Sequence, residues 1–373
     1  WLRPRMTVEP YRKLFALGLV SGIIGVGLWP LYLTGHVTYP ILPHSQIMVT
    51  GMFLAFVSGF LMTALPKMSG TAPASVMESW VAVGLLVGSV FMALVGQNVL
   101  ASALAGGQFI FLIQFAVRRF LKRQANPPQG FLFVPFGLLW GLLAMSLQTL
   151  EGAGFLLPAP FSELGKIGIQ QAFLLNLVVG LGSRLIPFLS RVGVADPMRQ
   201  LTESKAKGLS ILVALNLSFL LEPVLPTWSV YCLRGVVLGV AAVVLFGIFK
   251  KPSQVTIVGV SLRASVLMMT AAYLGIGFFP QFQLALLHIV FIGGYTLLTL
   301  TIATRVTLAH GGHSLIPEVR SPALVATLML LTVAAALRML SILPWASAFW
   351  LLAVLTWSIG IGRFLFARVR SPV

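Results

Sequence analysis

Five histidines are the residues of this chain best suited to ligate a metal or a haem: His36, His44, His288, His310 and His313. A neutral imidazole is a common ligand of haem iron and of other metals. His44 opens an apolar segment from its outer end, and His288 lies about seven residues, or roughly 10 Å, inside another. We predict that His44 and His288 face each other as axial ligands of one haem near the outer membrane surface. The alternatives are an interfacial His44 that hydrogen-bonds water and a His288 that is satisfied within the core.

Four further residues are weaker candidates for such a site. Met48 follows His44 by one helical turn, so its sulfur could replace an imidazole, although packing is the default role of a methionine in an apolar chain. His36 lies in the first external loop. His310 and His313 follow the inner end of a segment and flank a Gly-Gly pair. We expect solvated loop histidines there, with metal ligation as the alternative.

Arginines inside apolar segments form a second group of candidates. Arg234 and Arg338 lie near outer segment ends, where membrane topology disfavours positive charge. The propionates of a haem would supply an anionic partner through bidentate guanidinium contacts, so we predict that both arginines bind propionates. Arg184 and Arg305 end segments on the cytoplasmic side, close enough to the interface to snorkel, and helix anchoring accounts for them as well as function does.

The remaining reactive residues exclude several classes of function. Glu151, Glu163 and Glu222 lie near segment ends, and no carboxylate has the mid-membrane spacing of a proton relay, which disfavours a proton pump. Cys232 is the only cysteine, so an internal disulfide and a cysteine metal cluster are excluded. The sequence has no Walker loop, dinucleotide fingerprint, metalloprotease motif or serine elbow, which disfavours nucleotide-dependent and hydrolytic chemistry of the soluble type.

These residues are set in a chain that lipid must solvate. Of its 373 residues, 58% are hydrophobic and 9% are charged, unlike a soluble domain. Runs of about 20 apolar residues are long enough to cross about 30 Å of hydrocarbon. The fold expected is therefore an all-α polytopic membrane protein. We count twelve apolar runs, at roughly 14–34, 45–65, 79–97, 99–117, 131–150, 164–189, 208–222, 228–248, 258–278, 281–308, 322–341 and 345–366.

An internal repeat organises the twelve segments. Residues 59–66, 180–187 and 301–308 resemble one another at a spacing of 121 residues, which places Thr63, Arg184 and Arg305 on one phase. Each of these stretches ends the second segment of a group of four. We therefore predict a single transmembrane domain, 1–373, that consists of three pseudo-repeats at about 1–124, 125–250 and 251–373.

The distribution of Lys and Arg predicts the orientation. The N-terminal stretch, the C-terminal tail and the even-numbered loops are basic, whereas the odd-numbered loops between segments carry no Lys or Arg. By the positive-inside rule, both termini are predicted to be cytoplasmic. The net charge of +17 is then a topology signal and not a nucleic-acid footprint. The lipid bilayer is the expected partner, and nucleic acid is not.

Three motifs, in order and over nearly the whole chain, resemble one family. Residues 59–70, GFLMTALPKMSG, resemble the GFLLTA-P-x-x-TG signature of the NnrS family of haem- and copper-containing bacterial membrane proteins. Residues 182–188 resemble that family's GGRVIPF, and His288 followed by residues 304–310, TRVTLAH, resembles its H…TRVSLGHTG. The resemblance implies twelve helices, a bacterial inner-membrane location, haem b and a part in nitric oxide tolerance.

One departure from the family pattern puts copper in doubt. The pattern before the second helix reads roughly W-H-x-H-E-M, whereas residues 43–48 read PHSQIM, so Gln46 and Ile47 replace the second histidine and the glutamate. Gln46 precedes His288 by 242 residues, twice the repeat length, so the missing histidine stood at the repeat equivalent of His288. Because a glutamine amide is a poor ligand for copper or haem iron, we expect haem b and regard copper as doubtful.

The architecture also looks like the catalytic subunit of haem-copper oxidases and nitric oxide reductases, in which the second and tenth helices carry the low-spin haem. The histidines that hold the second metal there are absent, since the sixth and seventh segments have Gln170, Gln171 and Asn216. This likeness implies at most a low-spin haem, although a fold does not fix a function. The leading hypothesis is a haem protein that relays electrons, senses nitric oxide or protects against it. The alternatives are a cofactor-free subunit of a larger respiratory membrane assembly and a small-molecule transporter.

Overall fold

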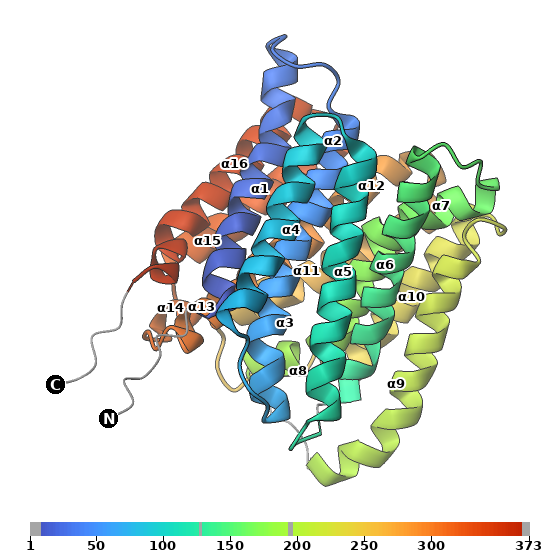
Figure 1. Cartoon of the computed structure of the whole chain (residues 1–373). Coiled ribbons are helices and arrows are strands. Elements are labelled where there is room, and N and C mark those ends of the chain that lie inside the picture. Colours follow the sequence, from blue (N-terminus) through green and yellow to red (C-terminus); the bar gives the residue numbers. More distant parts are fainter. Residues whose placement is uncertain (1–8, 127–128, 193–196, 368–373) are drawn as a thin grey trace. The chain divides into compact units, whose positions relative to one another are not determined.

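The protein is an all-α polytopic membrane protein (Figure 1). The computed structural model describes residues 9–126, 129–192 and 197–367, and every regular element within these ranges is a helix. Eleven helical spans in the described residues are long and apolar enough to cross a membrane. The expectation of an α-helical membrane protein is confirmed.

The chain divides into two compact units. The first unit comprises Trp1–Pro127, Ala303–His313 and Ile361–Val373, and the second comprises Pro128–Ile302 and Ser314–Gly360. The elements of the first unit are α1 (Pro10–Leu33), α2 (Ile41–Gln46), η1 (Ile47–Phe53), α3 (Leu54–Ser69), α4 (Val76–Leu94), α5 (Asn98–Leu121), the end of α13 (Leu297–His310) and η6 (Gly362–Leu365).

The second unit holds the remaining helices. Its first half consists of η2 (Gln129–Leu132), α6 (Phe133–Gly152), α7 (Ala159–Ile167), η3 (Gly168–Ala172), α8 (Phe173–Leu189), α9 (Pro197–Leu220) and α10 (Thr227–Val244). Its second half consists of α11 (Ile257–Phe278), η4 (Pro280–Phe282), α12 (Gln283–Ile289), η5 (Val290–Thr296), the start of α13, α14 (Ile316–Val319), α15 (Pro322–Met339) and α16 (Leu343–Gly360).

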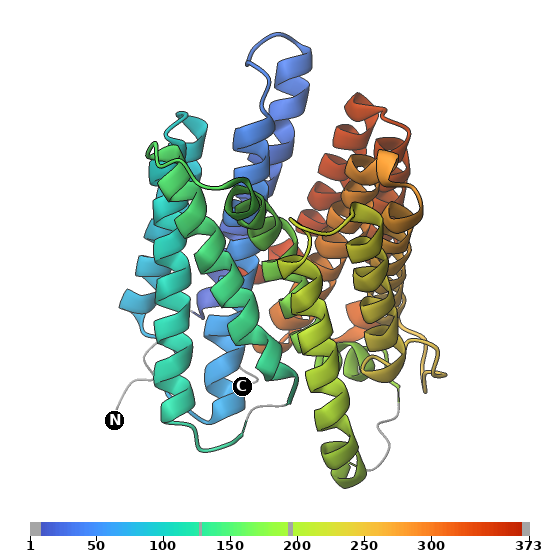
Figure 2. The ribbon, with the colours of Figure 1, turned by 90° about the vertical axis from the view of Figure 1, so that its right-hand side faces the viewer.

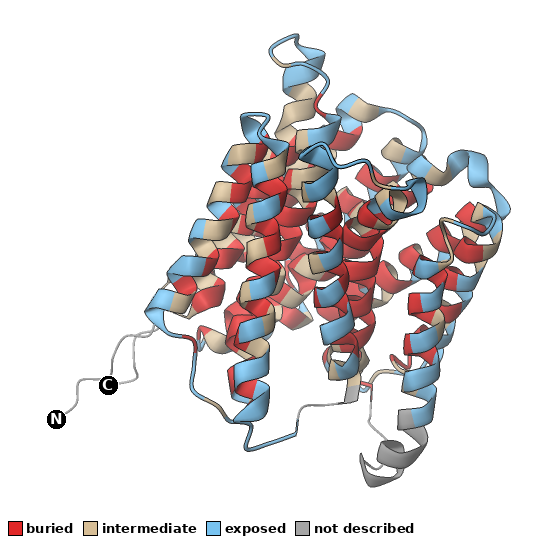
Figure 3. Cartoon of the chain, turned by 45° about the vertical axis from the view of Figure 1, so that its right-hand side comes forward, coloured by how far each residue is buried: buried red, intermediate tan, exposed pale blue. Residues whose placement is uncertain are grey.

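Three spans are more buried than the other eight. The buried share is 83% for Ile41–Ser69, 67% for Ala159–Leu189 and 61% for Pro280–His310, against 28–50% for the rest. Many of the other helices expose one face and bury the opposite one (Figure 3). These three buried spans contain the three stretches that resemble one another in sequence, so the echoed residues lie on the most buried of the eleven spans.

Each of these three buried spans contains a π-helical segment. These segments are η1, η3 and η5, which begin at residues 47, 168 and 290, that is, 121 and 122 residues apart. In η5 the hydroxyl of Thr296 donates to the carbonyl of Phe291, five residues earlier. A π turn widens a helix locally and often marks a functional site. The backbone irregularity therefore recurs with the spacing of the sequence echo.

Small residues let neighbouring helices approach the widened turns. Gly51, Ala172 and Gly293 follow one another at intervals of 121 residues, inside or at the end of the three π segments. A Cβ on Gly51 would lie 2.7 Å from Val90 of α4, and one on Gly293 would lie 2.7 Å from Met268 of α11. A larger side chain at either position would push the packed helix away.

The predicted seventh segment, 208–222, is part of a longer helix. α9 begins at Pro197, and its apolar part is the shorter helix Ala206–Leu220, which is why it is not among the eleven spans (Figure 2, yellow-green). Within the first unit, Nη1 of Arg12 in α1 donates to the carbonyl of Leu365 in η6 at 2.6 Å. The start of α1 and the end of the described chain thus meet within this unit.

Candidate functional site

His44 is oriented by the first helix of its own unit. It lies in α2, and its Nδ1 is 2.9 Å from the carbonyl oxygen of Gly25 in α1. Because a carbonyl only accepts, Nδ1 carries the proton, and in the neutral ring Nε2 holds the lone pair. The edge of the ring also contacts Trp29, with centroids 5.4 Å apart. The Met48 sulfur packs beside the same turn, 3.0 Å from where a Gly25 Cβ would lie.

His288, in the second unit, has the same tautomer, but its Nδ1–H bonds to a carbonyl of its own helix. It is half-buried in α12, and its Nδ1–H donates at 2.8 Å to the carbonyl of Leu284, one turn earlier on the same helix. The lone pair of the neutral ring is therefore again on Nε2. Phe291, in η5, packs against the ring with centroids 5.9 Å apart.

The other three histidines make different contacts. His36 is exposed, and its Nδ1 lies 2.9 Å from the Thr34 hydroxyl, which can donate or accept and so leaves the tautomer unassigned. Nε2 of His313 donates to the carbonyl of Phe364 at 3.3 Å. Of the five histidines, all of which the structure describes, His44 and His288 share a bond from Nδ1–H to a backbone carbonyl.

His310 belongs to an ionic cluster in the first unit. Its Nδ1 lies 2.6 Å from Lys67 Nζ and 3.2 Å from Glu9 Oε2, while Lys67 Nζ lies 3.0 Å from Glu9 Oε1. One ring nitrogen cannot accept from Lys67 and donate to Glu9 at the same time, so which of the two bonds it makes depends on the tautomer of the ring. His310 and His313 are both half-buried, and each contacts protein groups as well as solvent.

Glu9 lies outside the spans, at the start of α1, and its ionisation depends on this cluster. Burial raises the pKa of its carboxyl, but His310 and Lys67 lower it through hydrogen bonds and positive charge. The net effect is a pKa below the ordinary value of a glutamate. The carboxylate therefore stays charged as an anchor for Lys67.

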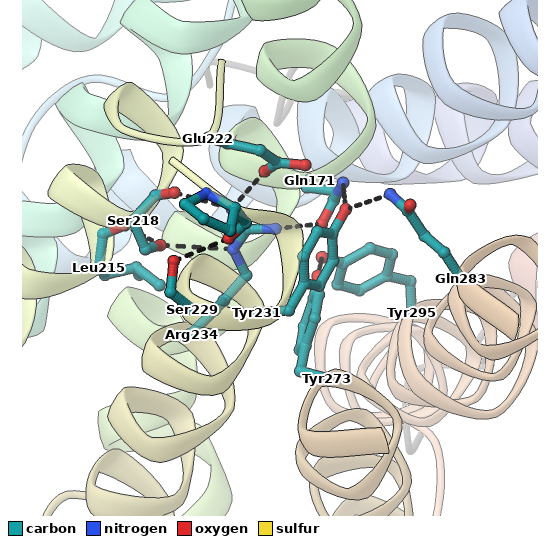
Figure 4. A network of polar contacts seen from close by, with 11 residues as sticks. Gln171, Leu215, Ser218, Glu222, Ser229, Tyr231, Arg234, Tyr273, Gln283 and Tyr295 are labelled. Carbon is teal, nitrogen blue, oxygen red and sulfur yellow. Dashed lines mark hydrogen bonds and ion pairs between the residues drawn. The ribbon is translucent and has the colours of Figure 1, made fainter. Parts of the chain in front are cut away.

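Arg234 forms the most enclosed charged site of the second unit (Figure 4). Its side chain is fully buried in α10. Nη2 donates to Glu222 Oε2 at 2.6 Å and to the carbonyl of Ser218 at 3.0 Å, and Nη1 donates to Gln171 Oε1 at 2.6 Å. The sequence prediction that Arg234 binds a propionate rested on a missing anion, and in this structure Glu222 is that anion.

Two tyrosines pack beside this guanidinium, and a third bonds with one of them. Arg234 lies 4.6 Å from the ring centroid of Tyr231 and 5.6 Å from that of Tyr273, within the range of cation–π attraction. The Tyr231 hydroxyl accepts from the side-chain amides of Gln171 and Gln283, both at 3.0 Å. The Tyr273 hydroxyl is 3.1 Å from that of Tyr295, a residue of η5. The network thus connects two of the three π segments.

The remaining predicted arginines are distributed among separate helices. Arg184 is exposed on α8, whereas Arg305 on α13 and Arg338 on α15 are half-buried. The exposure of Arg184 suits helix anchoring. A propionate contact of Arg338 stays a prediction.

Comparison with protein families identifies the family of this chain. The family model described as NnrS protein matches residues 5–370. The chain belongs to the NnrS family. No curated protein matches the sequence significantly. The resemblance seen in the three motifs is therefore confirmed over almost the whole chain.

In this NnrS chain, the residues that replace the family's second histidine and glutamate are structural. Gln46 donates its amide to the Ser102 hydroxyl at 3.2 Å, and Ile47 is fully buried. Asn216, on the predicted seventh segment, accepts from Trp140 at 2.7 Å and bonds with Asn176. Among the described residues, no group of three or more His, Cys, Asp or Glu side chains is placed to hold a metal.

Sequence reasoning missed the role of Glu222, which it treated as a helix-end residue. A usable signal was present, because Glu222 lies in the short loop between α9 and α10 and Arg234 lies about two turns inside α10 from that loop. A buried charge beside such a loop is expected to pair with an opposite charge on the preceding or following segment. The tyrosines carried no comparable signal, since their hydroxyls are brought together only by the packing of α10, α11 and η5.

Proposed function

We propose that this NnrS-family protein is an integral membrane haem b protein of the bacterial inner membrane, with His44 and His288 as axial-ligand candidates. The support is the shared tautomer, in which Nδ1–H donates to a backbone carbonyl and Nε2 holds the lone pair. Haem-ligating and metal-ligating histidines typically fix their second ring nitrogen in this way, because the hydrogen bond orients the ring and raises the basicity of the ligating nitrogen.

The donor set fits a low-spin haem better than a copper ion. A haem needs two axial donors from the protein, whereas a copper site needs a cluster of His, Cys or carboxylate ligands. The residues at the family's copper-associated positions, Gln46 and Ile47, are an amide bound to Ser102 and a buried alkyl group. When bound, haem would supply one-electron transfer and an affinity for nitric oxide. A role in nitric oxide tolerance or respiratory electron transfer follows as part of this proposal.

An absorption spectrum of the purified protein tests the proposal. We expect reduced Soret and alpha bands of b type, one iron per chain, and loss of the bands in His44→Ala and in His288→Ala. His36→Ala and His310→Ala are matched controls that should keep the bands, because their Nδ1 atoms do not donate to a backbone carbonyl. A featureless spectrum without iron would refute haem binding and favour a cofactor-free subunit of a larger membrane assembly. Loss of the bands in His310→Ala alone would move the site to the ionic cluster of the first unit.

A further inference from the structure

His288 lies near the start of a long helical span. α12, Gln283–Ile289, follows the 3-10 turn η4 and continues through the π segment η5 into α13. The first turn of a helix has backbone N–H groups without an intrahelical partner, so contacts with neighbouring helices help to fix its orientation. The imidazole of His288 points where the Leu284 carbonyl directs it, and Leu284 lies in the first turn of α12. Rotation of that turn would therefore redirect the ring.

Two hydrogen bonds hold this segment, one on each side of His288. Before it, the Gln283 amide donates to the Tyr231 hydroxyl at 3.0 Å, and Gln283 directly precedes Leu284. After it, the Tyr295 hydroxyl in η5 lies 3.1 Å from that of Tyr273. These contacts hold both the turn that supplies the carbonyl and the π segment that follows.

The tyrosine partners are themselves fixed by the buried guanidinium. The Tyr231 and Tyr273 rings lie 6.1 Å apart, and Arg234 packs against both. Glu222 and Ser218 hold Arg234 from the α9 side, and Gln171 bridges Arg234 to the Tyr231 hydroxyl (Figure 4). A chain of hydrogen bonds and cation–π contacts thus runs from α9 through α10 to both ends of the His288 segment.

We propose that the Arg234 network positions the imidazole of His288, with Gln283 and Tyr295 as its two points of contact with the histidine segment. This role differs from propionate binding and rests on the proposed function only where it treats His288 as a haem ligand. Gln283 and Tyr295 are positioning residues, because they act on the histidine through the backbone of α12 and η5. The network then sets the plane of the ring whether or not haem is bound.

The test uses Gln283→Leu and Tyr295→Phe in the full-length protein reconstituted in nanodiscs, with 15N-labelled histidine and His288→Gln to assign the signal. We expect one Nδ1-protonated signal for His288 in the parent protein. In each variant we expect the ratio of the two tautomers to fall about tenfold, which corresponds to about 1.4 kcal/mol. Trp140→Phe is the matched control, because it removes a buried 2.7 Å hydrogen bond of the same unit that does not involve α12 or η5.

An unchanged His288 signal in both variants would overturn the proposal. An equal change in Trp140→Phe would also overturn it, because the effect would then report general loosening of the unit. The readout concerns the histidine itself and needs no haem, so a haem-free parent protein would refute the proposed function without deciding this test. In haem-containing protein, the same two variants should shift the low-spin electron paramagnetic resonance signal while haem content is retained.

Discussion

Replacement of Glu222 tests whether the Arg234 guanidinium is sealed from water. The Arg234 side chain is fully buried, and the Glu222 side chain is 8% exposed. Removal of one partner from such a pair typically costs 3–5 kcal/mol, because it leaves an uncompensated buried charge. We therefore expect Glu222→Leu to lower the free energy of unfolding by about 4 kcal/mol. Glu222→Gln keeps an acceptor and loses the charge, so about 1.5–3 kcal/mol is expected.

A double variant separates the charge effect from lost packing. Arg234→Met with Glu222→Leu removes both charges and leaves Gln171 Oε1 and the Ser218 carbonyl without their donor. Each such group costs about 1–3 kcal/mol, so the double variant should lose about 2–6 kcal/mol, a range centred on the loss expected for Glu222→Leu although it lacks a second side chain. The exposed pair of Lys67 and Glu9 is the control, and Lys67→Met should cost no more than about 1 kcal/mol.

The assay is reversible unfolding in mixed micelles with increasing denaturing detergent, followed by tryptophan fluorescence. A loss below about 1 kcal/mol for Glu222→Leu in haem-free protein would refute the reasoning, because a sealed guanidinium could not tolerate the change so easily. A large loss in haem-free protein together with no loss in haem-loaded protein would instead show that a propionate can replace Glu222. The experiment thus also decides between the two roles considered for Arg234.

Two further predictions concern packing and pH. Gly180→Ala should destabilise the protein by about 1–3 kcal/mol, because the new Cβ would lie 2.7 Å from Phe133 and 2.8 Å from the Gly130 carbonyl oxygen. Gly84→Ala is the control. A Cβ there meets nothing within 4 Å, so this change should cost nothing measurable in the same assay. The pKa of Glu9 is lowered in the folded protein, so its contribution to stability is present above its unfolded pKa and is lost as pH falls through the folded pKa. Thermal unfolding followed from pH 7 to below about pH 4 should show this acid-side loss in the parent protein and a smaller one in Glu9→Gln; equal acid sensitivity of the two proteins would contradict it.

The helical architecture could be predicted from the sequence because lipid imposes a simple rule, a run of about 20 apolar residues for each crossing. The echoed stretches could also be predicted, because packing requires glycine at corresponding positions. Gly59 and Gly180 each pack against a neighbouring helix, where a larger side chain would collide. The seventh span was the least certain for a physical reason, because its apolar run, 208–222, is shorter than the roughly 20 residues that a crossing requires and follows the charged residues Lys205 and Lys207.

The candidate site could be predicted only in part. His44 and His288 were singled out by residue type, but their tautomers depend on the Gly25 and Leu284 carbonyls, which composition and spacing do not reveal. The pairing of Arg234 with Glu222 is a tertiary contact between two helices. Sequence reasoning assigned the arginine to a cofactor because it treated each charge on its own segment.

The π segments affect which residues of the three buried spans are assigned to the core. Each residue of an α-helix turns the chain by about 100°, so a wider turn shifts the angular phase of everything that follows it. His288 lies in α12, before η5, whereas residues 301–308 lie in α13, after η5. A helical wheel drawn for the whole span, Pro280–His310, would therefore assign the wrong residues to the core in one of its halves. The two halves can vary in sequence under separate packing constraints although they form one continuous span.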